Sequence, residues 1–202
     1  MPEEVLVFQR ALFPDLFHDG LCFDTGLLAE VLAASQFMPR DAVENDPAFK
    51  QFIPYSLLRY RGKVFRYMRT TRAGERRLHG LYSIGVGGHI NRQDSSSPAP
   101  GDGSIIDWAR DREVSEEFAF ECSHPPQLVA LLNDDSTDVG RVHFGIIYEY
   151  QLDGPHVESK ERGLHIRHTF VSIPELVAHG AEYEGWSQIV IAQYLGKELG
   201  HE

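Results

Sequence analysis

The chain has 202 residues, of which 42% are hydrophobic and 11% aromatic, so it is long enough to bury one sizeable core. Its 30 acidic and 19 basic residues give a formal net charge of -11, which argues against nonspecific binding to nucleic-acid polymers or membranes. Two cysteines without metal-type spacing, no signal-peptide pattern, and no apolar run of the roughly 18 to 20 residues that spans a bilayer predict a soluble, cytoplasmic protein.

The first part of the chain predicts a strand, a helix and a pair of strands. Val5–Gln9 has the composition of a strand, and Gly26–Ser35 predicts a helix because alanine and leucine favour that state and apolar residues recur at helical spacing. Ser56–Thr70 alternates large apolar with basic residues, which is typical of strands with one solvated face, and a turn is expected near Gly62 and Lys63.

The middle of the chain predicts a glycine-punctuated strand, a loop and a helix. The strand ends in GVGGHI, and the Ser, Pro, Gly and Asp-rich stretch Asn91–Ser104 predicts a loop. Ser104 and Asp107 resemble a capping box, in which each residue satisfies a backbone donor of the other. A helix is therefore expected from about Ile105 to about Phe118.

The last part of the chain predicts three strands and a closing helix. The strands are expected in residues 126–134, 140–152 and 164–173, and an amphipathic helix in residues 183–199. The order β, α, β, β, β, α, β, β, β, α predicts an α/β (α+β) fold with a mixed sheet instead of a doubly wound nucleotide-binding fold.

Three glutamates on the central helix are the clearest chemical signal. Glu113, Glu116 and Glu117 are three and four positions apart, so a helix places them on one side. Carboxylates that repel one another become favourable beside a hard divalent cation such as Mg²⁺ or Mn²⁺. Arg112 would either anchor one carboxylate or hold the glycine loop in register. The competing interpretation is a solvated helix face with an internal ion pair.

These residues resemble the signature of the Nudix hydrolases, Gly-x5-Glu-x7-Arg-Glu-aliphatic-x-Glu-Glu-x-Gly-aliphatic. Asp94 stands where the signature has its first glutamate, and 17 residues separate it from Arg112 instead of seven, so about ten are inserted within residues 93–104. The other matching positions are Gly88, Arg112, Glu113, Val114, Glu116, Glu117 and Phe120, whereas Ala119 replaces the last glycine.

The resemblance, which extends to the branch described as MutT-like phosphoesterases, implies a single Nudix-like α/β/α sandwich over residues 1–202, with 1–55 as an N-terminal extension. It also implies Mg²⁺ or Mn²⁺, a nucleoside diphosphate derivative as substrate, and a homodimer as a common state. The expected catalytic residues are Arg112, Glu113, Glu116 and Glu117; the expected metal ligands are these three glutamates and Gly88; the expected substrate-binding residues are Gly87, Gly88, His89, Arg66 and Arg69.

Two other functions remain open from the sequence. Asp94, Ala119 and the insertion are also compatible with a Nudix-fold module that binds a nucleotide for regulation without cleaving it. A structural domain whose acidic helix faces solvent is the third alternative. A zinc site at His165 and His168 is not expected, because residues three apart on a strand point to opposite faces.

Overall fold

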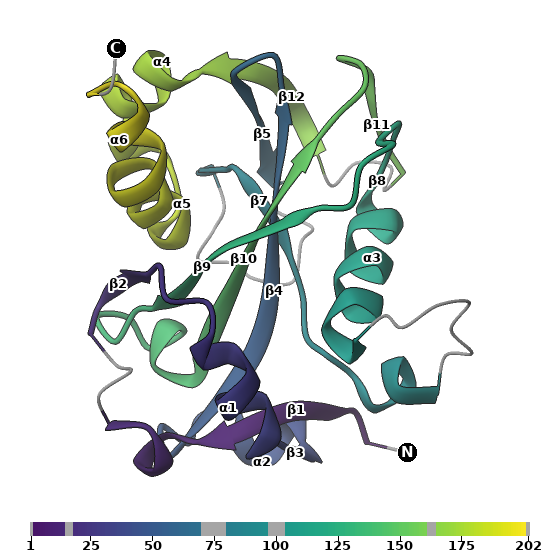
Figure 1. The fold of residues 1–202 in the computed structure, drawn as a ribbon, viewed down its shortest axis with the longest axis vertical. Helices are drawn as coiled ribbons and strands as arrows, with labels where there is room; N and C mark the ends of the chain where they lie inside the picture. Colours follow the sequence, from purple (N-terminus) through teal and green to yellow (C-terminus); the bar gives the residue numbers. More distant parts are fainter. Residues whose placement is uncertain (1, 15–17, 70–79, 97–103, 161–164, 201–202) are drawn as a thin grey trace. The chain divides into compact units, whose positions relative to one another are not determined.

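The chain folds as two compact units in the computed structural model, which describes residues 2–14, 18–69, 80–96, 104–160 and 165–200 (Figure 1). The first unit contains Met1–Tyr55, Gly87–Glu113 and Leu128–Ile147, and the second contains Ser56–Val86, Val114–Gln127 and Tyr148–Glu202. Residues 97–103 of the loop predicted at Asn91–Ser104 lie outside the described residues.

The observed elements confirm the predicted α+β class. The larger sheet has its strands hydrogen-bonded in the order β12-β5-β4-β10-β9-β2. In the part of the chain that the structure describes, no helix is long and apolar enough to cross a membrane. The strands are β1 (Glu4–Gln9), β2 (Gly20–Cys22), β3 (Gln36–Pro39), β4 (Phe49–Tyr60), β5 (Lys63–Arg69), β6 (Tyr82–Ser83), β7 (Gly85–Gly87), β8 (Phe118–Phe120), β9 (Gln127–Asn133), β10 (His143–Gln151), β11 (Val157–Ser159) and β12 (His165–Ser172).

The helices also follow the predicted order, with short additions. The helix expected at Gly26–Ser35 is α1, and the irregular stretch after it contains the short α2. The closing helix begins two residues later than predicted and contains one π-helical turn, Ile191–Leu195. The helices are α1 (Leu27–Ala33), α2 (Arg40–Val43), α3 (Ile105–Glu117), α4 (Ile173–Ala178), α5 (Gly185–Val190) and α6 (Gly196–Glu198).

The N-terminal segment is built into the first unit by strand pairing. β1 pairs antiparallel with β3 and with β4, where Val7 lies opposite Gln51. The amide of Leu6 also donates to the carbonyl oxygen of Ile90 at 2.8 Å, directly after the glycine stretch. The described part of residues 2–55 therefore helps to position the turn that carries Gly88.

The capping box predicted at the start of α3 is present. Ser104 donates from its amide and from its hydroxyl to Asp107 Oδ2 at 3.0 and 2.9 Å, and the Asp107 amide donates to Ser104 Oγ at 3.3 Å. These bonds satisfy amides that have no partner inside the first turn of a helix. The helix begins at Ile105 and ends at Glu117, one residue before the predicted end.

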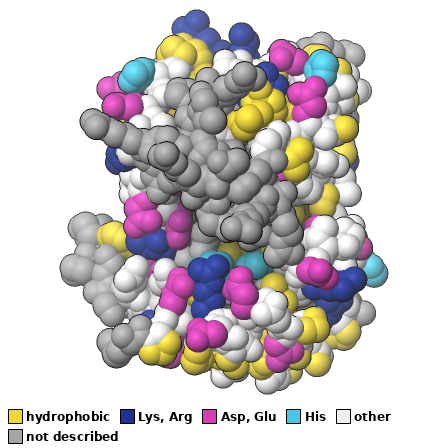
Figure 2. All heavy atoms as spheres, turned by 180° about the vertical axis from the view of Figure 1, so that it is seen from behind, with side chains coloured by type: hydrophobic (Ala, Val, Ile, Leu, Met, Phe, Trp, Pro, Cys, Tyr) yellow, Lys and Arg dark blue, Asp and Glu magenta, His cyan; other side chains and the backbone are white. Residues whose placement is uncertain are grey.

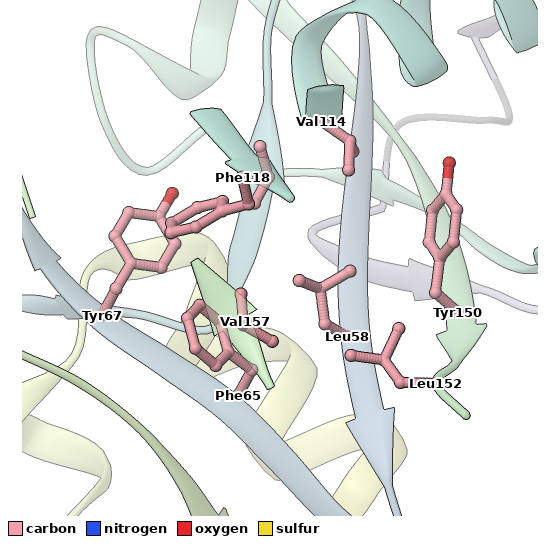
Figure 3. Close-up of a cluster of buried hydrophobic side chains, with 9 residues drawn as sticks. Leu58, Phe65, Tyr67, Val114, Phe118, Tyr150, Leu152 and Val157 are labelled. Carbon is pink, nitrogen blue, oxygen red and sulfur yellow. The ribbon is translucent and has the colours of Figure 1, made fainter. Parts of the chain in front are cut away.

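An aromatic and aliphatic core in the second unit holds the end of α3 (Figure 3). Val114 and Phe118 point into this core, where the ring of Phe118 lies 5.2 Å from the rings of Phe65 and Tyr67. Because Val114 faces the core, the turn of helix that carries the glutamates has a fixed rotation. The buried members are Leu58, Phe65, Tyr67, Val86, Val114, Phe118, Tyr150, Leu152 and Val157.

Candidate active site

Gly88 and Glu113 lie in direct contact. A Cβ atom built on Gly88 would be 2.0 Å from Glu113 Cδ and 2.2 Å from its Oε2, closer than nonbonded atoms approach. Only glycine therefore lets the backbone of this turn meet the carboxylate. The sequence interval between the two residues gives no sign of this contact, which depends on the packing of α3 against the end of β7.

Arg112 connects the helix to the glycine turn. Its Nη1 donates to Glu113 Oε1 at 2.7 Å, and its Nη2 donates to the carbonyl oxygen of His89 at 2.9 Å. Arg112 thus makes both of the contacts that were open from the sequence: it anchors a carboxylate and it holds the turn after Gly88 in register. A planar guanidinium can do this because its donors diverge in fixed directions.

Asp94 is the second carboxylate partner of Arg112. Arg112 donates from Nε to Asp94 Oδ1 at 2.8 Å and from Nη2 to Asp94 Oδ2 at 3.0 Å, a two-point ion pair with a side chain that is only 4% exposed. The amide of Asn91 also donates to Asp94 Oδ2 at 2.7 Å. The hydrogen bonds that Arg112 donates to Asp94, together with the charge of Glu113, raise the pKa of Arg112 above its ordinary value, so the guanidinium stays charged.

The three glutamates share one side of α3, as the helix period requires. At about 100° per residue, positions 113, 116 and 117 fall within an arc of about 100°. The side chain of Glu113 is 18% exposed, Glu117 is half-buried and Glu116 is exposed. The three carboxylates therefore differ in solvent exposure, from Glu113 against Gly88 to Glu116 in solvent.

Three other residues expected at a substrate site have different surroundings. A Cβ on Gly87 would lie 3.1 Å from the carbonyl oxygen of Pro54, so this glycine also serves close packing. Arg66 donates to the hydroxyl of Tyr183 at 2.9 Å and its guanidinium lies 4.4 Å from the centre of the Tyr82 ring. Arg69 is the last residue of β5. Binding of substrate phosphate by these residues stays a prediction.

His89 faces a second histidine from a distant part of the chain. The Nε2 atoms of His89 and His143 are 3.2 Å apart, and His143 Nδ1 lies 2.7 Å from the carbonyl oxygen of Val139. Burial, with a smaller contribution from the charge of Arg40, lowers the pKa of His89 to about 3. Burial also lowers the pKa of His143, so both imidazoles are neutral near pH 7.

Glu149 is held in a buried cluster of the second unit. It is 6% exposed and accepts hydrogen bonds from Arg59 at 3.0 Å, Tyr194 at 2.9 Å and Gln151 at 2.7 Å. Arg59 also donates to both carboxylate oxygens of Glu198, at 2.8 and 2.9 Å. These bonds occupy Glu149 in the structure of the core, which leaves the glutamates of α3 as the better candidates for chemistry.

Known proteins share the fold of this chain. No protein-family model matches the chain. The structure of Tm1382, described as a candidate Nudix hydrolase, matches with a TM-score of 0.78 and 27% identity, over 96% of this chain and 100% of that one. At that coverage, most of residues 1–55 have counterparts in Tm1382.

Two further solved structures share the fold at lower identity. The MutT protein of Methanosarcina mazei Go1 matches with a TM-score of 0.50 and 18% identity, over 74% of this chain and 95% of that one. The Nudix domain of Shewanella oneidensis NrtR, solved with ADP ribose, matches with a TM-score of 0.52 and 12% identity, over 74% and 88% of the two chains. Together with the match to Tm1382, these similarities identify the chain as a Nudix hydrolase.

Within this class, the chain belongs to the same family as Protein YmaB of Bacillus subtilis (strain 168). The two sequences are 36% identical over 170 residues, which covers 82% of this chain and 81% of the relative.

Sequence reasoning missed two residues beside the predicted site, Glu44 and His143. The side-chain ligand atoms of Glu44, His89 and His143 all lie within 4.8 Å of one another. Glu44 follows α2, and His143 begins β10, so neither has a spacing relation to the glycine turn. The only signal in the sequence was a histidine directly after GVGG, which predicts a polar contact but not its partners.

Proposed function

We propose that the chain hydrolyses a phosphoanhydride (pyrophosphate) bond in a nucleoside diphosphate derivative, with Mg²⁺ or Mn²⁺ held by the glutamates of α3. The observation that carries the proposal is the contact of the Glu113 carboxylate with Gly88, secured by Arg112, on the helix that also bears Glu116 and Glu117. A domain with these three features can hold a cation beside a turn whose backbone is open to a phosphate group.

The donor set fits the proposed ion. Three carboxylates within one arc of a helix supply only oxygen ligands, which Mg²⁺ and Mn²⁺ prefer over nitrogen or sulfur. Gly88 carries no Cβ, so its backbone carbonyl can approach the same ion. When bound, the ion would neutralise phosphate oxygens and make a water molecule more acidic.

Each residue has a distinct role in this proposal. Glu116 and Glu117 are the principal ligands, and Glu113 is either a third ligand or the base that orients the attacking water. Arg112 positions Glu113, because it binds that carboxylate, the Asp94 carboxylate and the His89 carbonyl oxygen together. Asp94 acts through Arg112: both of its oxygens accept hydrogen bonds from the guanidinium.

Replacement of Glu117 tests the function. Glu117→Gln keeps the shape and the helix propensity but removes the charge of a metal ligand, so metal-dependent turnover is expected to fall by at least about 100-fold, the upper end of what losing a mere partner of a metal ligand costs. Glu121→Gln is the matched control, because Glu121 is exposed and lies just beyond α3. Circular dichroism should be unchanged in both variants, and retained turnover in Glu117→Gln would reject the assignment.

The substrate screen should include ADP-ribose, NDP-sugars, dinucleoside polyphosphates and oxidised nucleotides, each with Mg²⁺ and with Mn²⁺. ADP-ribose comes first because a Nudix domain of the same fold was solved with it. Phosphate or nucleotide release that depends on the metal supports the hydrolase. Binding of a nucleotide with no release over the whole panel would instead favour a regulatory nucleotide-binding module.

A further inference from the structure

We infer that Glu44, His89 and His143 form a second metal site, which takes a divalent transition ion of the Zn²⁺ type and is separate from the carboxylates of α3. The side-chain ligand atoms of these three residues lie within 4.8 Å of one another, and all three residues belong to the first unit. Figure 2 shows histidine side chains next to acidic and basic ones on one face of the molecule. The inference does not depend on the proposed hydrolysis.

The spacing of the two imidazoles fits shared ligation. Two nitrogens that bind one tetrahedral ion at 2.0 to 2.1 Å are about 3.3 Å apart. His89 Nε2 and His143 Nε2 are 3.2 Å apart. Since no pair of ligand atoms is separated by more than 4.8 Å, the Glu44 carboxylate reaches the same ion after a side-chain shift of no more than about 1.5 Å.

A hydrogen bond to the Val139 carbonyl oxygen fixes the orientation of the His143 ring. A carbonyl oxygen can only accept a hydrogen bond, so the 2.7 Å contact with Val139 places the proton of neutral His143 on Nδ1 and the lone pair of Nε2 toward His89. A histidine that binds a metal typically donates its other ring N–H to such an acceptor. The Val139 carbonyl is itself part of a braced turn: the Gly140 amide donates to Thr137 at 2.9 Å, and buried Lys50 donates to the Gly140 carbonyl oxygen at 2.7 Å.

Glu44 has a comparable support. Arg40 Nε donates to Glu44 Oε2 at 3.1 Å, and Arg40 Nη1 donates to Glu3 at the same distance. A carboxylate has two oxygens, so Glu44 can hold Arg40 with one and a metal ion with the other. The arginine thereby orients the carboxylate in the same way that Val139 orients His143.

The donor set selects the kind of ion. Two imidazole nitrogens and one carboxylate suit Zn²⁺ and other first-row divalent ions, whereas Mg²⁺ prefers oxygen ligands alone. The α3 carboxylates and this cluster should therefore prefer different metals. An ion bound here would tie together three segments that lie far apart in the sequence, and it would hold His89, the residue that directly follows Gly88.

Metal binding by tag-free, full-length protein tests the inference. Equilibrium dialysis with Zn²⁺, and titration with Co²⁺ followed by its visible absorption, should show one tight ion per chain that depends on the cluster. His89→Gln, His143→Gln and Glu44→Gln should each weaken binding by more than the roughly 10- to 100-fold that loss of a supporting hydrogen bond costs. Zinc should raise the melting temperature of the wild-type protein and not that of these variants.

Matched controls separate this site from its surroundings. His179→Gln removes an exposed histidine elsewhere, and Glu3→Gln removes the other carboxylate partner of Arg40, so both should keep the zinc affinity. Glu117→Gln should also keep the zinc affinity while losing turnover, which distinguishes failure of this inference from failure of the proposed hydrolysis.

Two results would overturn the inference. One is the absence of a tightly bound Zn²⁺ or Co²⁺ ion in the wild-type protein, and the other is wild-type metal affinity in both His89→Gln and Glu44→Gln. Should His143→Gln fail to fold, those two variants and anomalous scattering at the zinc edge still decide it.

Discussion

Neither Gly88 nor Gly140 has room for a Cβ atom, but the neighbouring atoms are of two different kinds. A Cβ on either residue would lie 2.0 Å from another atom, but at Gly88 that atom is the carboxylate carbon of Glu113, and at Gly140 it is the backbone carbonyl oxygen of Asp134. A carboxylate at the end of a flexible side chain can rotate away, whereas a backbone carbonyl moves only if the turn moves. At the same contact distance, the neighbour of Gly88 can therefore move aside and the neighbour of Gly140 cannot.

The two turns also differ in what surrounds them. Asp134 is 3% exposed, and its carboxylate accepts hydrogen bonds from the Ser136 amide at 3.0 Å and from Thr137 at 3.2 Å, so the turn closes on itself. Gly88 instead lies between a half-buried carboxylate and a histidine whose carbonyl is held by Arg112. The Asp134 turn thus satisfies its polar atoms internally, whereas the turn at Gly88 places a carboxylate against its backbone.

The largest effect is expected from Gly140→Ala. The added methyl group must displace the backbone of the Asp134 turn, so we expect a loss of about 2 to 3 kcal/mol in the free energy of unfolding, as for overpacked cores. Urea denaturation of the variant measures it. Gly154→Ala is the control, because a Cβ there would have nothing within 4 Å. Equal stability of the two variants would contradict the prediction, because it would mean that the backbone of the turn accommodates the methyl group without a loss of unfolding free energy.

Gly88→Ala should separate function from stability. The methyl group would push the Glu113 carboxylate out of place by an ångström or more, and a displacement of that size can cost about 100-fold in rate. We therefore expect kcat/KM to fall by about that factor, with less than about 1 kcal/mol lost in unfolding free energy, within the range of mild substitutions. Turnover close to the wild-type rate would remove the Gly88–Glu113 contact from the proposed site.

The smallest effect should come from Asp135, which braces the Gly140 turn. Burial opposes ionisation of this carboxyl, but hydrogen bonds from Arg10, Lys50 and Asn133 outweigh it and lower the pKa of Asp135 from 3.8 to about 2. A carboxyl whose pKa is lower in the folded protein contributes stability above its unfolded pKa, and this is lost as the pH falls through its folded pKa.

Stability should therefore decline between about pH 4 and pH 2, by about 1 kcal/mol or less for an ion pair with access to solvent. Asp135→Asn should lose the corresponding part of this pH dependence in urea denaturation. The same slope in the variant and the wild type would assign the decline to other groups.

Local sequence patterns predicted most of the elements but fewer of their contacts. The Ser104–Asp107 capping box, α3, and the pairing of residues on either side of the turn at Gly62 follow from spacing and turn chemistry, and the structure contains them. β8 and β11 were not predicted, since strands of three residues are too short to show a period. The alternation in Ser56–Thr70 predicted a strand face exposed to solvent, yet the basic residue Arg59 is 8% exposed and paired with Glu149.

The sequence by itself determined that Glu113, Glu116 and Glu117 share one side of a helix, because backbone hydrogen bonds fix the rotation between residues three and four apart. Only the tertiary structure decided what lies opposite them. The ion pair of Arg112 with Asp94 joins residues 18 positions apart, and the contact of His89 with His143 joins residues 54 apart. No periodicity in the sequence indicates the contact of Gly88 with Glu113. Such contacts depend on how buried side chains pack the elements together, which no spacing within one segment encodes.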